Sequence, residues 1–200
     1  MRIATIRCLG TRPVGLLALL LILAAPAHAD GILDALRVPG NIAFMRHALA
    51  PFGAGGRETG MRAATLGSCA TQRNLSDAGR ADARRIGELF RREGIVFDQV
   101  FASKWCRTRD TAEIVMGRPV DNLPLIDSYF TDPDKSIGPA QIAALKKYLS
   151  TDLPPGTRAL MVTHGSLISD LAGIETGETE IVVVRADGRG GVVVVGHGVP

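Results

Sequence analysis

Residues 41–47, Asn-Ile-Ala-Phe-Met-Arg-His, form a short apolar run that ends at Arg46 and His47. Gly40 precedes the run and a glycine-rich segment follows it, which is the pattern of a buried β-strand. The two polar side chains are therefore expected at the carboxyl end of a strand, where open α/β sheets bind their ligands. The alternative is a strand that ends in a solvent-exposed polar pair with no further role.

A second apolar run with the same ending lies far downstream, at residues 158–164, Arg-Ala-Leu-Met-Val-Thr-His. Between the two runs, residues 97–103 alternate as a strand, and Ser103 is expected to cap the helix that follows. That cap would place Arg107 in the first turns of the helix, at the same sheet edge as His47 and His164. A helix N-terminus with an arginine beside it is suited to an anion.

The alternation of strands and helices predicts one α/β domain with three layers, α/β/α, and a mainly parallel central sheet. Ser76 is the expected N-cap of a helix that runs to about Glu93, and Pro139 is expected at the first position of another helix. Residues 121–138 are expected to be irregular. A hairpin over residues 181–195 should add an antiparallel edge.

The first 29 residues have the pattern of a secretory signal peptide. Three arginines precede an apolar run at residues 14–25, and Ala27-His28-Ala29 is a small-x-small cleavage site. The run is too short for a membrane-spanning helix. We therefore predict a mature domain of residues 30–200, periplasmic or secreted, that does not span a membrane after cleavage.

The mature chain is not basic. Removing the three arginines of the leader from the 23 basic residues leaves 20, which equals the 20 acidic residues. A nucleic-acid role needs a basic face and so loses its support. The arginines at residues 80–92 alternate with acidic residues, which predicts a solvated helix face. We expect no nucleic-acid partner.

The mature chain keeps two cysteines, Cys69 and Cys106. In an oxidising compartment such a pair can form a disulfide, and the alternative is two buried free thiols. Two cysteines and three scattered histidines have no metal-ligand spacing, so neither a metal site nor a cofactor is predicted.

Arg46, His47, Arg107 and His164 should thus meet on one edge of the sheet. Arginine binds phosphate oxygens in a bidentate manner. A neutral imidazole is a competent nucleophile near pH 7. Together these side chains predict phosphoryl transfer through a phosphohistidine, on a small phosphorylated substrate. The alternative is four unrelated structural residues.

Four stretches resemble the histidine phosphatase superfamily, of the phosphoglycerate-mutase-like fold, in their order and approximate spacing. They are Arg46-His47, Leu75–Arg80 (LSDAGR), Ser103–Ala112 (SKWCRTRDTA) and Thr163-His164-Gly165. Within the superfamily the chain looks most like small exported members, of which a lipopolysaccharide core heptose phosphatase is one. Residues 69–76 and Gly177-Glu178 carry that finer likeness.

The resemblance implies an exported phosphatase of phosphomonoesters, such as envelope sugar phosphates. It implies that His47 becomes phosphorylated, that Arg46 and Arg107 hold the phosphoryl oxygens, and that His164 completes the pocket. A mutase is less favoured, because its phosphorylated sugar-acid substrates are scarce outside the cytosol. The competing class is a non-catalytic phosphate-binding or envelope-interaction protein that kept the pocket without turnover.

The chain departs from the superfamily pattern at several positions. Ala48 replaces the usual glycine, Lys104 replaces the proline after Ser103, and an asparagine often found shortly after the histidine is missing. The general acid that protonates the leaving oxygen is expected to be Asp127 or Glu178. The alternative for each is a solvated loop carboxylate. Some small members work without an obvious acid, which suits good leaving groups.

Overall fold

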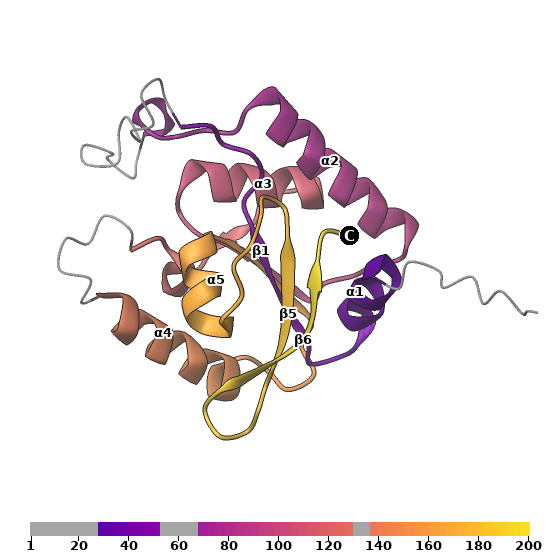
Figure 1. The fold of residues 1–200 in the computed structure, drawn as a ribbon, viewed down its shortest axis with the longest axis vertical. Helices are drawn as coiled ribbons and strands as arrows, with labels where there is room; N and C mark the ends of the chain where they lie inside the picture. Colours follow the sequence, from indigo (N-terminus) through magenta and orange to yellow (C-terminus); the bar gives the residue numbers. More distant parts are fainter. Residues whose placement is uncertain (1–27, 53–67, 130–136) are drawn as a thin grey trace, which may run out of the picture.

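The apolar run before His47 forms β1 (Ile42–Arg46), near the middle of the sheet. The computed structural model describes residues 28–52, 68–129 and 137–200 (Figure 1). The other strands of this part of the chain are β2 (Gln99–Ala102), β3 (Asp121–Asn122), β4 (Ala159–Thr163), β5 (Ile181–Ala186) and β6 (Val192–Gly198). Its α-helices are α1 (His28–Arg37), α2 (Asp77–Arg92), α3 (Cys106–Met116), α4 (Ile137–Lys147) and α5 (Gly165–Ala172).

The strands lie in the order β3-β2-β4-β1-β5-β6. The first four run parallel, while β5 pairs with β1, and β6 with β5, in the antiparallel sense. The predicted fold class, a three-layer α/β/α arrangement with an antiparallel C-terminal hairpin, is confirmed. Because β1, β2 and β4 are parallel, the residues that follow them meet at one edge of the sheet.

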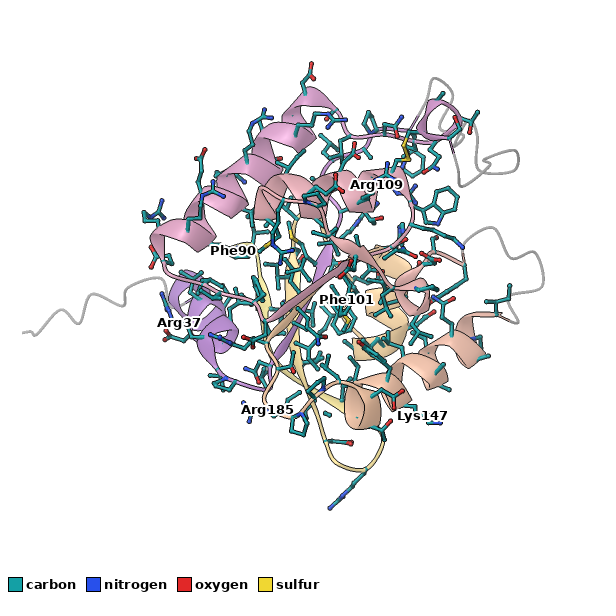
Figure 2. The ribbon with its side chains drawn as sticks, turned by 180° about the vertical axis from the view of Figure 1, so that it is seen from behind. Arg37, Phe90, Phe101, Arg109, Lys147 and Arg185 are labelled. Atoms are coloured by element: carbon teal, nitrogen blue, oxygen red, sulfur yellow. A yellow bond between two sulfur atoms is a disulfide. The ribbon has the colours of Figure 1, made fainter. Side chains whose placement is uncertain are left out.

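Alternate side chains of the strands pack into two separate cores, one on each face. Ala43 and Met45 of β1 face α1, α2 and α3, whereas Ile42 and Phe44 face α4 and α5. Phe90 and Phe101, labelled in Figure 2, belong to these two different cores. β1 and β4 are buried on both faces, as their nearly unbroken apolar sequences predict.

Helix α2 begins where its sequence predicts. The Ser76 hydroxyl accepts the backbone N–H of Gly79 at 3.0 Å, which satisfies one of the free donors of the first turn. Two glycines let this helix lie directly on neighbouring backbone. A Cβ at Gly79 would lie 2.2 Å from the carbonyl oxygen of Leu49, and one at Gly87 would lie 2.3 Å from that of Val115. The absence of a side chain at Gly79 thus lets α2 pack closely against the chain just after His47.

Two predicted helix starts are wrong. Ser103 does not cap α3, which begins at Cys106 with Trp105 as its N-cap, because the Ser103 hydroxyl bonds the Asp127 carboxylate instead. Pro139 is the third residue of α4 rather than the first. Proline is still tolerated there, because first-turn N–H groups have no partner within the helix.

Two elements had no counterpart in the prediction. Helix α1 spans the expected cleavage site and buries Ile32 and Leu36. Strand β3 lies in the segment expected to be irregular; its two residues are polar and exposed, so their sequence has no strand pattern. Their pairing with Phe101 and Ala102 of β2 depends on tertiary context.

The predicted signal peptide lies almost wholly in residues 1–27, outside the described residues. The expected first residue of the mature domain, Asp30, falls inside α1, which begins at His28. Among the helices of the described residues, none is both long enough and apolar enough to cross a membrane.

Candidate active site

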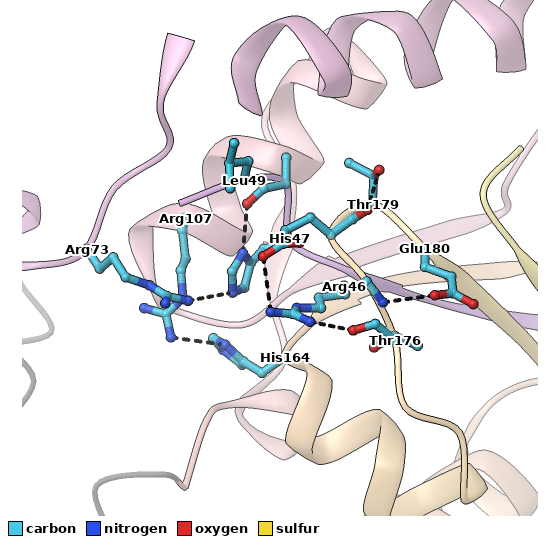
Figure 3. A network of polar contacts seen from close by, with 12 residues as sticks. Arg46, His47, Leu49, Arg73, Arg107, His164, Thr176, Thr179 and Glu180 are labelled. Atoms are coloured by element: carbon cyan, nitrogen blue, oxygen red, sulfur yellow. Dashed lines mark hydrogen bonds and ion pairs between the residues drawn. The ribbon is translucent and has the colours of Figure 1, made fainter. Parts of the chain in front are cut away.

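His47 follows β1 and is almost fully buried, with 2% of its surface exposed. Its backbone N–H donates to the carbonyl oxygen of Thr163 at 3.0 Å, which extends the pairing of β1 with β4 by one residue. Its Nδ1 lies 2.8 Å from the carbonyl oxygen of Ala48. Because a carbonyl oxygen only accepts, Nδ1 carries the proton and Nε2 keeps its lone pair. The backbone thus fixes the tautomer that a nucleophilic Nε2 requires (Figure 3).

His164 follows β4 and is the N-cap of α5. Its Nδ1 lies 3.2 Å from an amino group of Arg107, which can only donate. Its Nε2, 2.9 Å from the Ser103 hydroxyl, therefore carries the proton and donates to that oxygen. The hydroxyl in turn donates to Asp127 Oδ1 at 3.1 Å. A chain of hydrogen bonds thus runs from Asp127 through Ser103 to His164.

Arg107 lies in the first turn of α3 and is 2% exposed. Its guanidinium carbon lies 5.0 Å from the centroid of the Trp105 ring, a cation–π distance that helps to hold it. Thr111, one turn later, links this helix to the nucleophile: its hydroxyl donates to the Arg107 carbonyl oxygen and accepts the Ala48 N–H at 3.0 Å. Both histidines and Arg107 are therefore positioned by regular elements, as predicted.

Arg46 reaches the same cavity from the end of β1. One of its amino groups donates to the carbonyl oxygen of Thr176, and the other contacts Glu178 Oε1 at 3.2 Å. The loop before β5 thus holds this guanidinium (Figure 3). The ion pair leaves Arg46 partly neutralised, whereas Arg107 lies against a neutral histidine.

Both histidines are neutral near pH 7. Burial, with smaller contributions from the charges of Arg107, Arg73 and Arg46, lowers the pKa of His47 from 6.5 to about 3, against a raising effect of the Ala48 hydrogen bond. Burial and then Arg107 also lower the pKa of His164 well below its usual value. The lone pair of His47 is thus available at physiological pH.

The side chains meet at a cavity of about 230 Å³. It is lined by Arg46, His47, Phe52, Arg73, Arg107, Ser128, His164, Gly165, Ser166 and Glu175. Gly165 and Ser166 are the first two residues of α5, so a helix N-terminus faces the cavity and favours an anion there. All four predicted phosphate-site residues are therefore brought together.

The two predicted acids are placed differently: neither Asp127 nor Glu178 is among the residues that line the cavity. Asp127 accepts from Ser103 and from the backbone N–H of Lys104, and it also pairs with Lys104 Nζ at 3.0 Å. Glu178 pairs with Arg46. Among the described residues the carboxylate that lines the cavity is Glu175, whose Oε1 accepts the Ser169 hydroxyl at 2.6 Å.

Arg73 is a site residue that the sequence prediction missed. One of its amino groups lies 3.3 Å from Nε2 of His47, and its guanidinium carbon lies 4.1 Å from the centroid of the Phe52 ring. The available signal was its neighbour Cys69: a bridge to Cys106 would bring Arg73 close to Arg107. That disulfide is present, beside Arg109 in Figure 2, and it is one of the two alternatives that the sequence left open.

The described residues contain no group of three or more histidine, cysteine, aspartate or glutamate side chains that could hold a metal ion. Arginines and histidines make up five of the ten residues that line the cavity. Guanidinium groups bind anions and do not bind metal cations.

Comparison with known proteins points to one family. The model of the histidine phosphatase superfamily (branch 1) matches residues 42–126, which include His47 and Arg107. A search of curated proteins found no match.

Several solved structures share the fold. The protein histidine phosphatase SixA complexed with tungstate is 20% identical, with a TM-score of 0.53, covering 80% of this chain and 97% of its own. A phosphoserine phosphatase mutant from Entamoeba histolytica, in complex with phosphoserine, is 15% identical, with a TM-score of 0.53 and coverages of 78% and 95%. A mycobacterial glucosyl-3-phosphoglycerate phosphatase in complex with VO3 is 14% identical, with a TM-score of 0.51 and coverages of 72% and 92%.

Proposed function

We propose that this chain, whose residues 42–126 match the model of the histidine phosphatase superfamily (branch 1), belongs to that superfamily and is a phosphatase in which His47 accepts the phosphoryl group of a small phosphorylated substrate. One observation carries the proposal. Nε2 of a buried, neutral His47 keeps its lone pair while three guanidinium groups, those of Arg46, Arg73 and Arg107, line the same cavity. A nucleophile surrounded by donors for three equatorial oxygens suits phosphoryl transfer.

In the proposed reaction, the Nε2 lone pair attacks phosphorus as the bond to the leaving oxygen breaks in line. The N–H groups of Arg46 and Arg107 balance the charge on the phosphoryl oxygens, while His164 accepts from Arg107 through Nδ1 and so helps to position that guanidinium. Water then attacks the phosphohistidine, releases inorganic phosphate and restores the imidazole. The hydrogen bond from Nδ1–H to Ala48 stabilises the positive charge that the ring gains during attack.

We further propose that the substrates are phosphomonoesters, with envelope sugar phosphates as one class, and that the protein is exported. Solved structures with this fold hold tungstate, phosphoserine or VO3, which are phosphate analogues or a phosphomonoester. The leader-like pattern of the first 29 residues supports export. The Cys69–Cys106 disulfide supports it as well, because such bridges persist in oxidising compartments.

A second candidate is a phosphate-binding protein without turnover. It is favoured by the position of the two predicted acids, Asp127 and Glu178, outside the lining of the cavity. Such a protein would bind an oxyanion with the same residues but would form no covalent adduct.

A trapping experiment separates the two. The protein without its leader is mixed with phosphomonoesters in the presence of EDTA and quenched rapidly. A phosphatase should carry an acid-labile, base-stable phosphoryl group on His47. His47→Ala should abolish the adduct and lower kcat by ~10³-fold or more, because the covalent step is lost. His197→Ala, an exposed histidine on β6, is the matched control and should keep both. Activity of His47→Ala within tenfold of the wild type would refute the mechanism.

A further inference from the structure

Arg73 reaches the nucleophile from a segment that belongs to no strand or α-helix. Its amino group lies 3.3 Å from His47 Nε2, the atom that would bond to phosphorus. Because this donor faces the Nε2 lone pair, to which phosphorus would bond, the amino group would shift from the nitrogen to an oxygen of the phosphoryl group. Phe52, 57% exposed at the rim, stacks on the same guanidinium.

The segment that carries Arg73 is fastened to the start of α3 at two points. Cys69 forms the disulfide with Cys106, the first residue of that helix. Gln72 Oε1 accepts the backbone N–H of the same Cys106 at 2.8 Å. Within the segment, Asn74 closes a turn by donating to the Cys69 carbonyl oxygen at 2.7 Å. Arg73 and Arg107 are thus set against each other through a single residue, Cys106.

We propose that Arg73 is a phosphoryl ligand, and that the Cys69–Cys106 disulfide is the device that places it in the cavity. The inference rests on the proposed function. In the oxidised protein, the guanidinium groups of Arg46, Arg73 and Arg107 are all held at the phosphoryl site. In the reduced protein, Arg73 loses its support, whereas Arg107 is still held by α3 and Arg46 by the loop before β5.

The bridge is open to exchange. Cys106 is buried, but Cys69 is only half-buried, and the Arg109 guanidinium lies 3.2 Å from Cys69 Sγ. A neighbouring cation stabilises a cysteine thiolate and so favours exchange at this position. A dithiol reductant would supply two electrons and two protons, leaving two cysteine thiols and an oxidised, cyclic dithiol. Of the two fastenings to the start of α3, the segment would then keep the hydrogen bond of Gln72.

The proposal is tested with a double-mutant cycle on anion affinity. The affinities for orthovanadate and inorganic phosphate are measured for the wild type, Arg73→Ala, Cys69→Ser and the double variant. Arg73→Ala should weaken binding by about 10- to 100-fold, because a charged oxygen loses its donor. Cys69→Ser, or dithiothreitol on the wild type, should weaken it by a smaller factor. The double variant should bind no more weakly than Arg73→Ala alone, because the bridge acts through Arg73.

Two further variants guard against misreading a folding defect. Arg84→Ala removes an exposed arginine of α2 and should leave the affinity unchanged. Gln72→Ala keeps the disulfide but removes the other fastening, so it should weaken binding a few-fold and should also add nothing to Arg73→Ala. Thermal melts establish that each variant is folded at the temperature of the measurement.

The outcomes discriminate between this inference and the proposed function. If the losses of anion affinity from Arg73→Ala and Cys69→Ser multiply in the double variant, the disulfide acts on stability rather than on Arg73. If affinity falls with Arg107→Ala but not with Arg73→Ala, Arg73 is no ligand, while the phosphate site stands. A wild-type protein that binds neither anion would overturn the proposed function and this inference together.

Discussion

The two halves of the cavity are held in place by different means. On one side, His47, Arg107 and His164 come directly from strand ends and a helix start, and backbone pairing or buried side chains fix them. On the other side, Arg73 and Phe52 lie on irregular segments. We call these the sheet edge and the loop rim. The sheet edge is nearly inaccessible to solvent, whereas Phe52 is mostly exposed.

The difference suggests a division of roles. Residues of the sheet edge are fixed by the same interactions that fold the domain, so they hold the phosphoryl group in one geometry. The loop rim depends on a disulfide, on Gln72 and on a stacked ring, and each can change without unfolding the core. We expect chemistry to depend on the edge, and affinity and substrate choice to depend more on the rim.

The largest expected effect is a loss of folding stability when the space between α2 and the chain after His47 is filled. Gly79→Ala would place a methyl group 2.2 Å from the Leu49 carbonyl oxygen, which is backbone and cannot rotate away. We expect a loss of about 3 kcal/mol in the free energy of unfolding, at the upper end of overpacking effects. Urea denaturation, read from a midpoint shift at constant m-value, measures it.

The same substitution elsewhere provides the control. Gly31, in α1, has nothing within 4 Å of its missing Cβ. Gly31→Ala should therefore stabilise the protein by up to ~1 kcal/mol, through helix propensity alone. If both variants gave the same sign, the close contact of α2 with the sheet edge would not be a constraint.

The sheet edge is also the part of the site that the sequence predicts well. An apolar run that meets a histidine places that histidine at a strand end, and parallel pairing of β1 with β4 then brings His47 and His164 together. Arg107 was predicted at the right place even though its helix begins three residues after the expected cap. The helix start moved because Ser103 bonds Asp127 and His164 instead of the helix amides.

The loop rim could not be predicted in the same way. Nothing in the spacing of Arg73 indicates that its segment folds back onto α3, because a disulfide and a side-chain hydrogen bond act over a separation of more than 30 residues. The surroundings of the candidate acids could not be predicted for a related reason: Asp127 and Glu178 lie outside the lining of the cavity, and the role of each as the general acid stays a prediction. Asp127 looks like a free loop carboxylate in the sequence, and its bonds to Ser103 and Lys104 come from tertiary structure.

A test at acidic pH sharpens the contrast in burial. His47 is neutral in the folded protein because burial lowers its pKa to about 3, whereas in the unfolded chain it titrates near 6.5. Below pH 6.5 the unfolded state therefore takes up a proton that the folded state does not, and stability falls as the pH falls. Between pH 6.5 and 5, His47 alone should cost ~1.5 kcal/mol.

The measurement compares His47→Asn with the wild type by urea unfolding at both pH values, without phosphate. The variant should lose ~1.5 kcal/mol less than the wild type on acidification, while His164 contributes a similar loss to both proteins. The lowered pKa values of Asp98 and Asp187 act below pH 4, outside this window. Equal losses of stability in the two proteins would mean that the pKa of His47 is not lowered in the folded state, and that His47 is therefore not buried at the sheet edge.

The smallest expected effect is on the rate of hydrolysis, from a change at Asp127. It decides whether this residue positions His164 at the sheet edge or protonates the leaving group. A general acid matters for an alkyl phosphate and hardly at all for p-nitrophenyl phosphate, so its loss would slow the alkyl ester selectively, by roughly 10²–10⁴-fold. Asp127, however, bonds Ser103 and through it orients His164. We therefore expect Asp127→Asn to slow both esters alike, by about tenfold, as for a lost positioning contact. Glu175→Gln is the comparison, because Glu175 lines the cavity. A selective alkyl loss in Asp127→Asn would make Asp127 the acid and move it from the sheet edge to the leaving-group side.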